Sequence, residues 1–375
     1  MKKTITLLLS AFLVSCFSLS AMQKDMKDID KLRQTEKSRK LDYSELTHEE
    51  RLTKIEEQQL TDVRYYDYLS SYRAKIYFLL DFLYWTADNH GWDNYAVDTV
   101  VGNTTNIDIQ PREFDYGPGV RCGLGAKTPL DWHVYLGWTY FVNTTKDRAI
   151  GNLQMSNTLV RNFENFEGSL KISYSMFDLE FDRPFHGGKT FNFRPHFGLR
   201  AGWVKQVGTN VARDDLSTPG TYTTPSIAYY KDSMWVVGPR LGCDAELFFA
   251  RNWGFSIYGN FAAALLYGNV KSRLLLHWTE LISTTIGNTY NLTMKDDEIK
   301  ATMQTAIGLS WGDFITEDED VALRIRLGWE SNYWWNMYYP TNFVPTGGTT
   351  AAWTLQKENE PLIFQGLVLG ARVDF

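Results

Sequence analysis

The sequence predicts an all-β fold, a transmembrane antiparallel β-barrel of ten to twelve strands preceded by a short charged helical segment. Three observations lead to this prediction. Apolar and polar side chains alternate over segments much longer than the typical strand of about five to six residues. Aromatic residues make up 15% of the chain, as expected where rings sit between lipid and water. Short and long connections also alternate between the expected strands.

Residues 1–21 predict a secretory signal peptide, because two lysines precede an apolar run from Ile5 to Val14. Small residues follow as far as Ala21, which suits ordinary cleavage. The stretch LVSC resembles a bacterial lipoprotein box, which would make Cys16 a lipid anchor. We favour ordinary cleavage and an exported protein.

Residues 22–66 predict a charged helical segment in the periplasm. Apolar residues recur there at helical spacing, first at Met26, Ile29 and Leu32. One interpretation is a solvated spacer. The other is a coiled coil that joins copies of the protein or contacts the cell wall, although the clean heptads that this requires are absent.

Residues 67–375 predict the barrel, and from residue 74 onward the period of the apolar residues is two. In DSMWVVGPRLGCDAELFF, eight consecutive positions of one parity, from Trp235 to Phe249, are apolar. A lipid-facing strand needs such a face over ~9–11 residues. Ten strands are expected to start near residues 74, 115, 131, 167, 189, 232, 253, 297, 320 and 361.

The connections support a membrane barrel, because outer-membrane barrels have short periplasmic turns and longer outer loops. The expected short connections are KTPLD, PFHGGK, ARNW and FITEDED, and the expected long ones are 88–114, 145–166, 206–231, 273–296 and 338–360. Both termini would then be periplasmic. The stretch RLLLHWTELISTTIGNTYNL leaves room for a further hairpin, which would give twelve strands.

One expected strand, GSLKISYSMFDLEFDRPF, does not keep a single apolar parity. Leu170 and Met176 share one parity, whereas Phe177 and Phe181 hold the other. A β-bulge near Met176 would reconcile the two.

The last strand explains why the chain ends on an aromatic residue. Phe375, Val373 and the alternating apolar residues before them provide a lipid face for the strand that closes the barrel, and only a closed barrel pairs all backbone groups of a sheet in lipid. This ending also resembles the assembly signal that the outer-membrane insertion machinery reads. The expected partners are therefore outer-membrane lipid and that machinery.

The barrel sequence also resembles a known family. The segments that carry the resemblance are LDFLYWTAD, GVRCGLGAKTPLDWHVYLGWTYF, FRPHFGLRAGW, WVVGPRLGCDAELFFARNWGFSIYGNFAAALLYG and GLVLGARVDF. Over about residues 74–375 the chain resembles the pore-forming major outer-membrane proteins of Legionella and related chlamydial-type proteins. The resemblance implies a porin or structural role in the outer membrane. The charged segment 22–66 and the low cysteine count depart from the family's pattern.

The polar parity of the strands is expected to line the barrel interior. The candidate pore-lining residues are Arg121, Lys127, Arg194, Arg200, Arg240, Asp244, Glu246, Lys300, Arg324, Arg326, Glu330 and Arg372. Asp81 and Asp374 are further acidic candidates of the same parity. Their basic excess favours anions if water fills the interior. We expect passive, weakly anion-preferring diffusion of small solutes. The alternative is a structural or adhesive protein with a plugged barrel, because ten to twelve strands leave little space inside.

Other functions receive little support from the sequence. An outer-membrane hydrolase is an alternative because His90 and His277 are expected at the outer rim. It is a remote one, since no nucleophile motif accompanies these histidines. Cys122 and Cys243 are expected to be unpaired. No cofactor or metal site is expected. The formal charge of −6 does not favour nucleic acid as a partner.

Overall fold

The computed structural model describes most of the chain from Ile76 onward. The residues expected to form the signal peptide and the charged helical segment lie outside the described residues. The described ranges are 76–89, 93–101, 104–111, 113–128, 132–154, 163–187, 190–213, 226–250, 254–278, 288–316, 321–338, 342–345, 353–356 and 359–375. Within these ranges no helix is long and apolar enough to cross a membrane.

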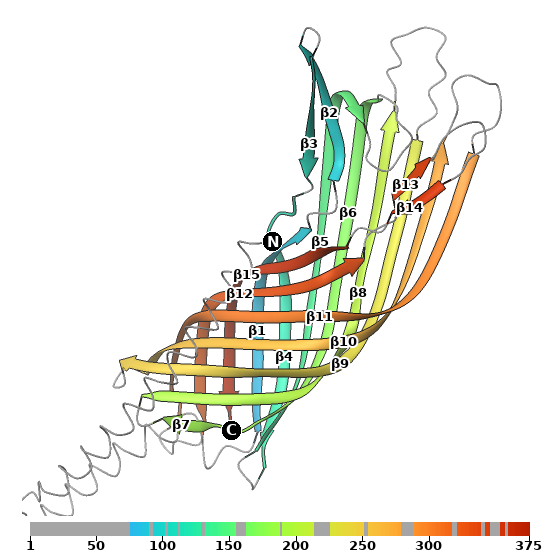
Figure 1. Cartoon of the computed structure of the whole chain (residues 1–375). Helices are drawn as coiled ribbons and strands as arrows, with labels where there is room; N and C mark the ends of the chain where they lie inside the picture. Colours follow the sequence, from blue (N-terminus) through green and yellow to red (C-terminus); the bar gives the residue numbers. More distant parts are fainter. Residues whose placement is uncertain are drawn as a thin grey trace, which may run out of the picture. The chain divides into compact units, whose positions relative to one another are not determined.

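The described strands form a closed antiparallel barrel of ten strands (Figure 1). Each strand pairs with its neighbours in chain order, and β1 pairs with β15 over 13 residue pairs to close the ring. The barrel strands are β1 (Ile76–Asn89), β4 (Gly117–Lys127), β5 (His133–Gln154), β6 (Phe163–Asp182), β8 (Phe191–Arg213), β9 (Ser226–Ala250), β10 (Phe255–Trp278), β11 (Asn288–Phe314), β12 (Ala322–Tyr338) and β15 (Asn359–Asp374).

Five shorter strands lie outside the ring. They are β2 (Asp93–Val101), β3 (Thr104–Pro111), β7 (Phe185–Gly187), β13 (Asn342–Pro345) and β14 (Trp353–Gln356). β2 and β3 form a hairpin that pairs with β5 at two residues, β7 pairs with β8, and β13 pairs with β14. The twelve-strand alternative is therefore wrong, because residues 273–278 belong to β10 and residues 288–292 to β11, and these two strands pair directly with each other.

The short connections follow β4, β6, β9 and β11, as expected, and all of them lie at the end of the barrel that also holds Phe375. We call this the short-turn end. The backbone N–H of Phe375 donates to the Ile76 carbonyl oxygen at 2.9 Å, which joins the last residue to the first strand. In the turn between β9 and β10, Gly254 has a φ of 68°, and a Cβ there would lie 2.1 Å from the Gly312 oxygen. Glycine is thus required at this turn.

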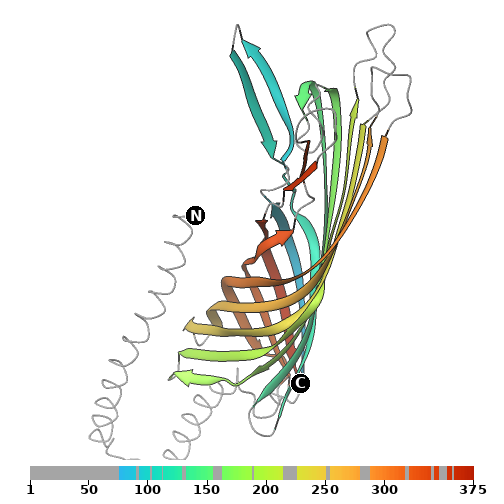
Figure 2. The ribbon, with the colours of Figure 1, turned by 45° about the vertical axis from the view of Figure 1, so that its right-hand side comes forward.

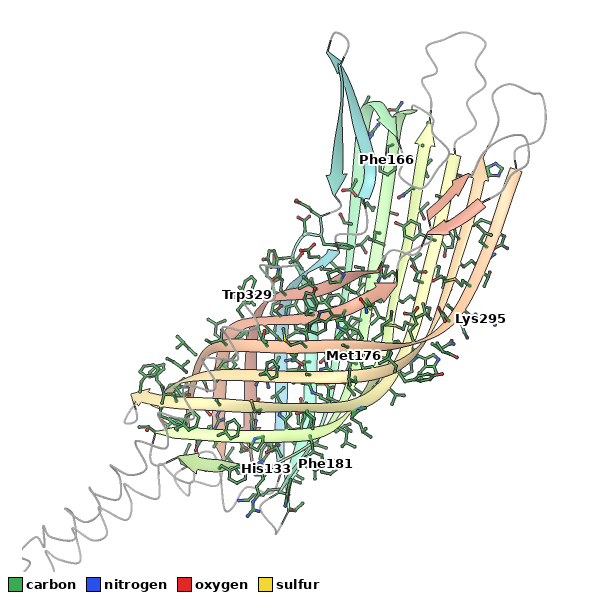
Figure 3. The ribbon with its side chains drawn as sticks, viewed as in Figure 1. His133, Phe166, Met176, Phe181, Lys295 and Trp329 are labelled. Carbon is green, nitrogen blue, oxygen red and sulfur yellow. The ribbon has the colours of Figure 1, made fainter. Side chains whose placement is uncertain are left out.

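An apolar band surrounds the barrel on its outside next to the short-turn end, and we call it the belt. Its outward side chains are large, apolar and exposed, for example Leu241 at 64% and Leu265 at 60%. Aromatic rings mark its two edges. The far edge carries Tyr84, Tyr140, Trp203, Trp235, Tyr267 and Trp329, the last of which is labelled in Figure 3.

Six strands, β5 to β11, continue well beyond the belt, and we call their far part the extension. Figure 2 shows β8 to β11 passing from the belt into the extension as continuous strands. The expected long connections 145–166, 206–231 and 273–296 are therefore largely wrong. Those segments are mostly strand, since β5 reaches Gln154, β8 reaches Arg213 and β10 reaches Trp278.

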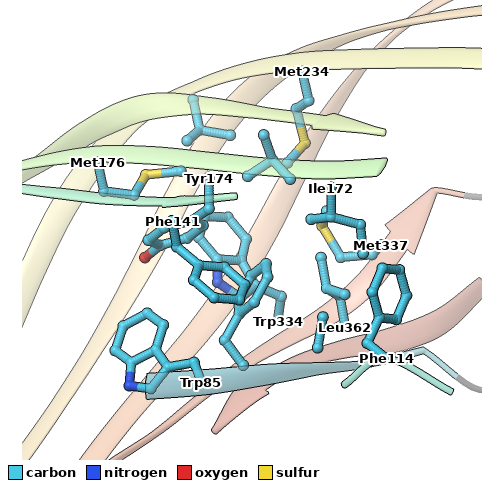
Figure 4. Packing of buried hydrophobic residues seen from close by; sticks show 14 of the residues in the cluster. Trp85, Phe114, Phe141, Ile172, Tyr174, Met176, Met234, Trp334, Met337 and Leu362 are labelled. Carbon is cyan, nitrogen blue, oxygen red and sulfur yellow. The ribbon is translucent and has the colours of Figure 1, made fainter. Parts of the chain in front are cut away.

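The interior of the extension is apolar. Fully buried rings of Trp85, Phe141, Tyr174 and Trp334 pack together where the belt passes into the extension (Figure 4). The buried ring of Phe364 belongs to the same cluster. Aliphatic and methionine side chains continue this core farther out. They include Leu170, Ile172, Val204, Met234, Val236, Leu266, Val270 and Leu274. Burial of each such side chain contributes about 1.5–3 kcal/mol.

The strand β6 contains no bulge near Met176, so that expectation is wrong. Its register with β5 and with β8 is continuous through this region. Leu170 and Met176 face the apolar interior of the extension, whereas Phe177 is exposed on the belt. The parity changes because the strand passes from one environment into the other.

Candidate pore interior

Inside the belt the barrel is lined with charged side chains from the polar parity of the strands. The basic ones are Arg121, Arg194, Arg200, Arg240, Arg324, Arg326 and Arg372, and the acidic ones are Asp81, Asp178, Glu180, Asp182, Asp244, Glu246, Glu330 and Asp374. Every arginine in this set forms an ion pair with a carboxylate of the set.

The first cluster joins strands on both sides of the β1–β15 seam. The Arg121 guanidinium of β4 lies 2.6 Å from a carboxylate oxygen of Glu330 on β12 and 3.2 Å from Asp81 on β1. Arg326 donates to the same Asp81 at 2.6 Å. Asp81 is fully buried, so the two guanidinium groups replace the water that its charge would otherwise require.

The second cluster lies on the opposite wall. Arg200 of β8 donates two hydrogen bonds to Asp178 of β6, at 2.6 and 2.9 Å. Arg240 of β9 donates to Glu180 at 2.8 Å.

Gln304 of β11 connects the two clusters. Its side-chain oxygen accepts hydrogen bonds from Arg200 and from Arg240, each at 2.8 Å. Its amide nitrogen donates to Glu330 at 2.8 Å. Polar contacts therefore reach from β6 and β8, through β11 and β12, to β4 and β1.

A third group of ion pairs lies toward the short-turn end. Arg194 pairs with Asp244 at 2.6 Å, and Arg324 pairs with Glu246 at 3.3 Å. Arg372 pairs with its strand neighbour Asp374 and places its guanidinium carbon 3.7 Å from the centre of the Tyr77 ring.

The two predicted lysines lie apart from these clusters. Lys127 is at the end of β4 beside His133 in the register. Lys300 is fully buried beyond the arginine clusters, where its ammonium donates to Glu298 and to the Asn336 carbonyl oxygen.

Three interior carboxylates, Asp178, Glu180 and Asp182, are absent from the set that sequence analysis selected. All three lie on β6, whose change of parity concealed which side faces inward. These three carboxylates offset the basic excess on which the expected anion preference depends. The only signal for them in the sequence is the strand's alternation after Met176, read with Phe177 on the lipid side.

A cavity of about 160 Å³ lies among these charged groups inside the belt. Its wall includes Arg121, Glu180, Arg240, Asp244, Arg326 and Glu330. A polar space of this size holds several water molecules. The interior of the belt is thus charged and partly hollow.

Aromatic side chains cross the interior next to this cavity, on its side toward the extension. Tyr174 of β6 and Trp334 of β12 meet edge to face, with ring centres 5.9 Å apart. Four strands separate β6 from β12 in either direction around the ring, so the two rings come from opposite walls. Phe364 of β15 lies 4.8 Å from Tyr174, between centres. We call these rings the aromatic layer.

The residues of the expected assembly signal lie at the seam. The Phe375 ring packs edge to face on Phe78 of β1, with centres 5.9 Å apart, and remains half exposed. Val373 is opposite Phe78 and Leu323 in the two registers. Both residues thus face outward on the belt.

The histidines considered for hydrolysis do not form a site in the described part of the chain. His90 lies outside the described residues. His277 faces outward near the end of β10, where its Nδ1 atom is 3.0 Å from the Thr289 hydroxyl oxygen. Cys122 and Cys243 are both free thiols.

Comparison with solved structures finds weak likeness to other outer-membrane proteins. The outer-membrane protease OmpT of Escherichia coli matches with a TM-score of 0.40 and 12% identity, covering 81% of this chain and 98% of that chain. The attachment invasion locus protein Ail of Yersinia pestis matches with a TM-score of 0.23 and 8% identity, covering 81% and 99%. A FadL homologue of Pseudomonas aeruginosa matches with a TM-score of 0.26 and 7% identity, covering 80% and 90%.

Comparison with curated proteins finds no match. The family model described as the Legionella pneumophila major outer membrane protein precursor, in contrast, matches residues 71–375, which include every barrel strand. The resemblance found in the sequence is thereby confirmed. A closed barrel with an apolar belt is also the architecture expected of a protein in that membrane. The chain is an outer-membrane β-barrel protein and belongs to the Legionella major outer-membrane protein family.

Proposed function

We propose that the protein lets small polar solutes diffuse passively across the outer membrane through the barrel interior. The observation that supports this most directly is the charged cavity inside the belt. A barrel with only a structural role gains little from so many buried charges, because ion pairs in a protein interior are often no more stabilising than apolar residues of similar volume. Charged walls around water are, however, what a polar solute requires.

The proposed orientation places the short-turn end and both termini in the periplasm. Outer-membrane barrels have their short turns on that side. The extension then projects from the outer surface of the cell. The insertion machinery and the surrounding lipid are the partners that this topology requires, and residues 22–66 would be available to the cell wall or to a second copy.

We propose little preference between anions and cations, in place of the weak anion preference expected from the sequence. The reason is that each interior arginine of the belt is paired with a carboxylate. Seven arginines against eight carboxylates leave almost no excess charge of either sign for a passing ion.

A plugged barrel with a structural or adhesive role is the second candidate. The contact between Tyr174 and Trp334 favours it, because rings from opposite walls meet across the interior. In the proposed pore this aromatic layer is the narrowest point, whereas in the second candidate it is a permanent seal.

Conductance of the purified full chain in planar lipid bilayers separates the two candidates. A pore gives discrete steps in the wild type, and Trp334→Ala enlarges them because it removes the largest ring of the aromatic layer. A plug gives no steps in the wild type. Absence of steps in both proteins, with the barrel intact by its faster gel mobility before heating, would contradict solute passage altogether.

A further inference from the structure

A band of basic side chains surrounds part of the barrel directly beyond the far edge of the belt. These side chains point outward, away from the interior network. They are Lys171 on β6, Lys205 on β8, Lys231 on β9, Lys271 and Arg273 on β10, and Lys295 on β11, and Figure 3 labels Lys295. We call these six residues the basic band.

The strand register arranges the band in two neighbouring rows. One row runs from Lys205 through Ser233 and Lys271 to Lys295. The next row contains Lys171, Val207, Lys231 and Arg273. Lys271 is therefore directly opposite Lys295, and Lys231 is directly opposite Arg273.

Like charges in directly opposite positions of a sheet destabilise it. No lysine of the band forms an ion pair with any carboxylate in the part of the chain that the structure describes. The acidic residue next to the first row, Asp297, instead accepts a hydrogen bond from Asn269 at 2.7 Å. Arg273 donates to the neutral side chain of Asn291 at 3.1 Å.

Basic residues farther out on the extension are arranged differently. Arg213 and Arg148 lie 3.7 and 4.0 Å from Glu167, so their charges have an acidic neighbour within the protein. The lack of ion pairs therefore distinguishes the basic band from Arg148 and Arg213.

The depth of the band relative to the membrane indicates what would neutralise it. Lys205 follows the edge residue Trp203 by two positions, and Lys231 precedes Trp235 by four. At about 3.3 Å per residue, the band lies roughly 7–13 Å along the strands from the aromatic edge. Because the strands of such barrels are tilted by about 35–45°, this corresponds to roughly 5–10 Å along the membrane normal. The lipid headgroups extend about 5–8 Å on either side of the hydrocarbon, so the band lies at their level and at their outer surface.

We propose that the basic band binds the phosphate groups of phosphorylated glycolipids in the outer leaflet. Phosphates are the acidic groups found at that depth, and two rows of ammonium groups present donors to several of them at once. Bound phosphate also removes the repulsion between Lys271 and Lys295. This inference rests on the proposed orientation of the barrel but not on solute passage.

Lipid binding by the full chain in phosphatidylcholine nanodiscs tests the proposal. Lipid A with both phosphates is added, and the thermal unfolding of the barrel and the lipid retained in native mass spectra are measured. The wild type is stabilised by this lipid and not by the same glycolipid without phosphates. The triple variant Lys205→Gln, Lys271→Gln, Lys295→Gln binds about a hundredfold more weakly, by the usual contribution of a basic residue at an anionic membrane.

Two controls make the outcome specific. The triple replacement by arginine keeps binding, and Arg148→Gln with Arg213→Gln leaves it unchanged.

In phosphatidylcholine alone the glutamine variant is more stable than the wild type, because the repulsion between the lysines is gone. Equal lipid binding by the wild type and the glutamine variant would overturn the proposal. Equal stabilisation by free inorganic phosphate would also overturn it. Because this experiment does not measure conductance, its result can overturn lipid binding without affecting the proposal of solute passage.

Discussion

The belt and the extension use the same strands but place apolar side chains on opposite faces. In the belt, β9 turns Leu241 outward and Arg240 inward to the ion pairs. In the extension, the same strand turns Lys231 outward and Met234 inward to the apolar core. The alternation of side chains along the backbone does not change between the two regions. What changes is the medium outside the wall, which is lipid in one region and water in the other.

This exchange of faces shows that the apolar parity of a strand marks the side shielded from water, which is the drier side, and not necessarily the side that faces lipid. In the belt the drier side is the outside, and in the extension it is the inside. A strand that passes between the two must exchange its apolar parity without any irregularity of the backbone. β6 does so at Met176 and Phe177.

The largest expected effect comes from opening a cavity in the core of the extension. Phe141→Ala removes a fully buried ring between Trp85 and Phe364. It should destabilise the barrel by about 3–5 kcal/mol, as large-to-small changes in packed cores do. The matched variant Phe261→Ala faces lipid on the belt, where acyl chains fill the space, and should cost much less. Urea unfolding in lipid vesicles measures both, and equal losses would contradict the assignment of the two regions.

A charge placed on the outer face tests the inversion directly. Leu241→Arg puts a guanidinium near the middle of the belt and should destabilise by about 2–4 kcal/mol. Val211→Arg puts the same group on the outer face of the extension, opposite Glu167 in the register, and should have almost no effect. The same unfolding measurement applies. A large cost at Val211 would mean that lipid covers the extension as well.

A buried carboxyl in the extension should make stability depend on pH. Asp232 lies on β9 beyond the belt, and burial raises its pKa to about 7, although the Ser272 hydroxyl beside it opposes the shift. The group binds its proton more tightly in the folded state. The barrel should therefore lose stability as pH rises from about 4 to about 7, with no further loss above that range.

Asp232→Asn should remove this dependence. The difference in unfolding midpoint between wild type and variant should be absent near pH 4 and largest above pH 7. A difference that does not vary with pH would show that the carboxyl is not responsible.

The smallest expected effect concerns charge inside the belt. Arg324→Glu together with Arg326→Glu leaves Glu246 and Asp81 without these partners and should shift ion selectivity toward cations. The shift in reversal potential under a salt gradient measures this. Lys205→Glu, which lies outside the wall, serves as the control. An unchanged reversal potential in the double variant would place both arginines away from the path of the ions.

The belt is the part of the fold that the sequence predicts well. Its strands combine length, strict alternation and aromatic edges, as in the run from Trp235 to Phe249. Lipid imposes this pattern on every strand it touches, so the pattern can be recognised one strand at a time. Eight of the ten barrel strands begin within four residues of the expected position, whereas β9 begins six and β11 nine residues earlier than expected.

The sequence does not distinguish the strands of the extension from loops, because water does not impose an apolar outer face on a strand. The described parts of the segment 206–231 carry polar residues such as Thr209, Arg213 and Lys231 on their outer side, which resembles loop composition. The apolar side chains inside the extension pack against side chains of strands that are far apart in the chain. Tyr174 and Trp334 are such a pair, and local sequence gives no sign of their contact.

The site was predicted residue by residue but not as a network. Parity selected Arg121 and Glu330, whereas their ion pair joins residues 209 positions apart and depends on how the barrel closes. The sequence of β6 does not predict that Asp178 faces inward, because the apolar side chains of this strand change parity after Met176. Pairing inside a closed ring is a property of the whole ring.

The seam between β1 and β15 has a consequence for the order of assembly. Leu80 of β1 pairs with Ala371 of β15, the last barrel strand to be synthesised. Until β15 arrives, β1 exposes a row of unpaired backbone amides and carbonyls, the kind of edge that invites aggregation. Closure must therefore follow the synthesis of β15, and until then the edge of β1 has to be kept from pairing with other copies.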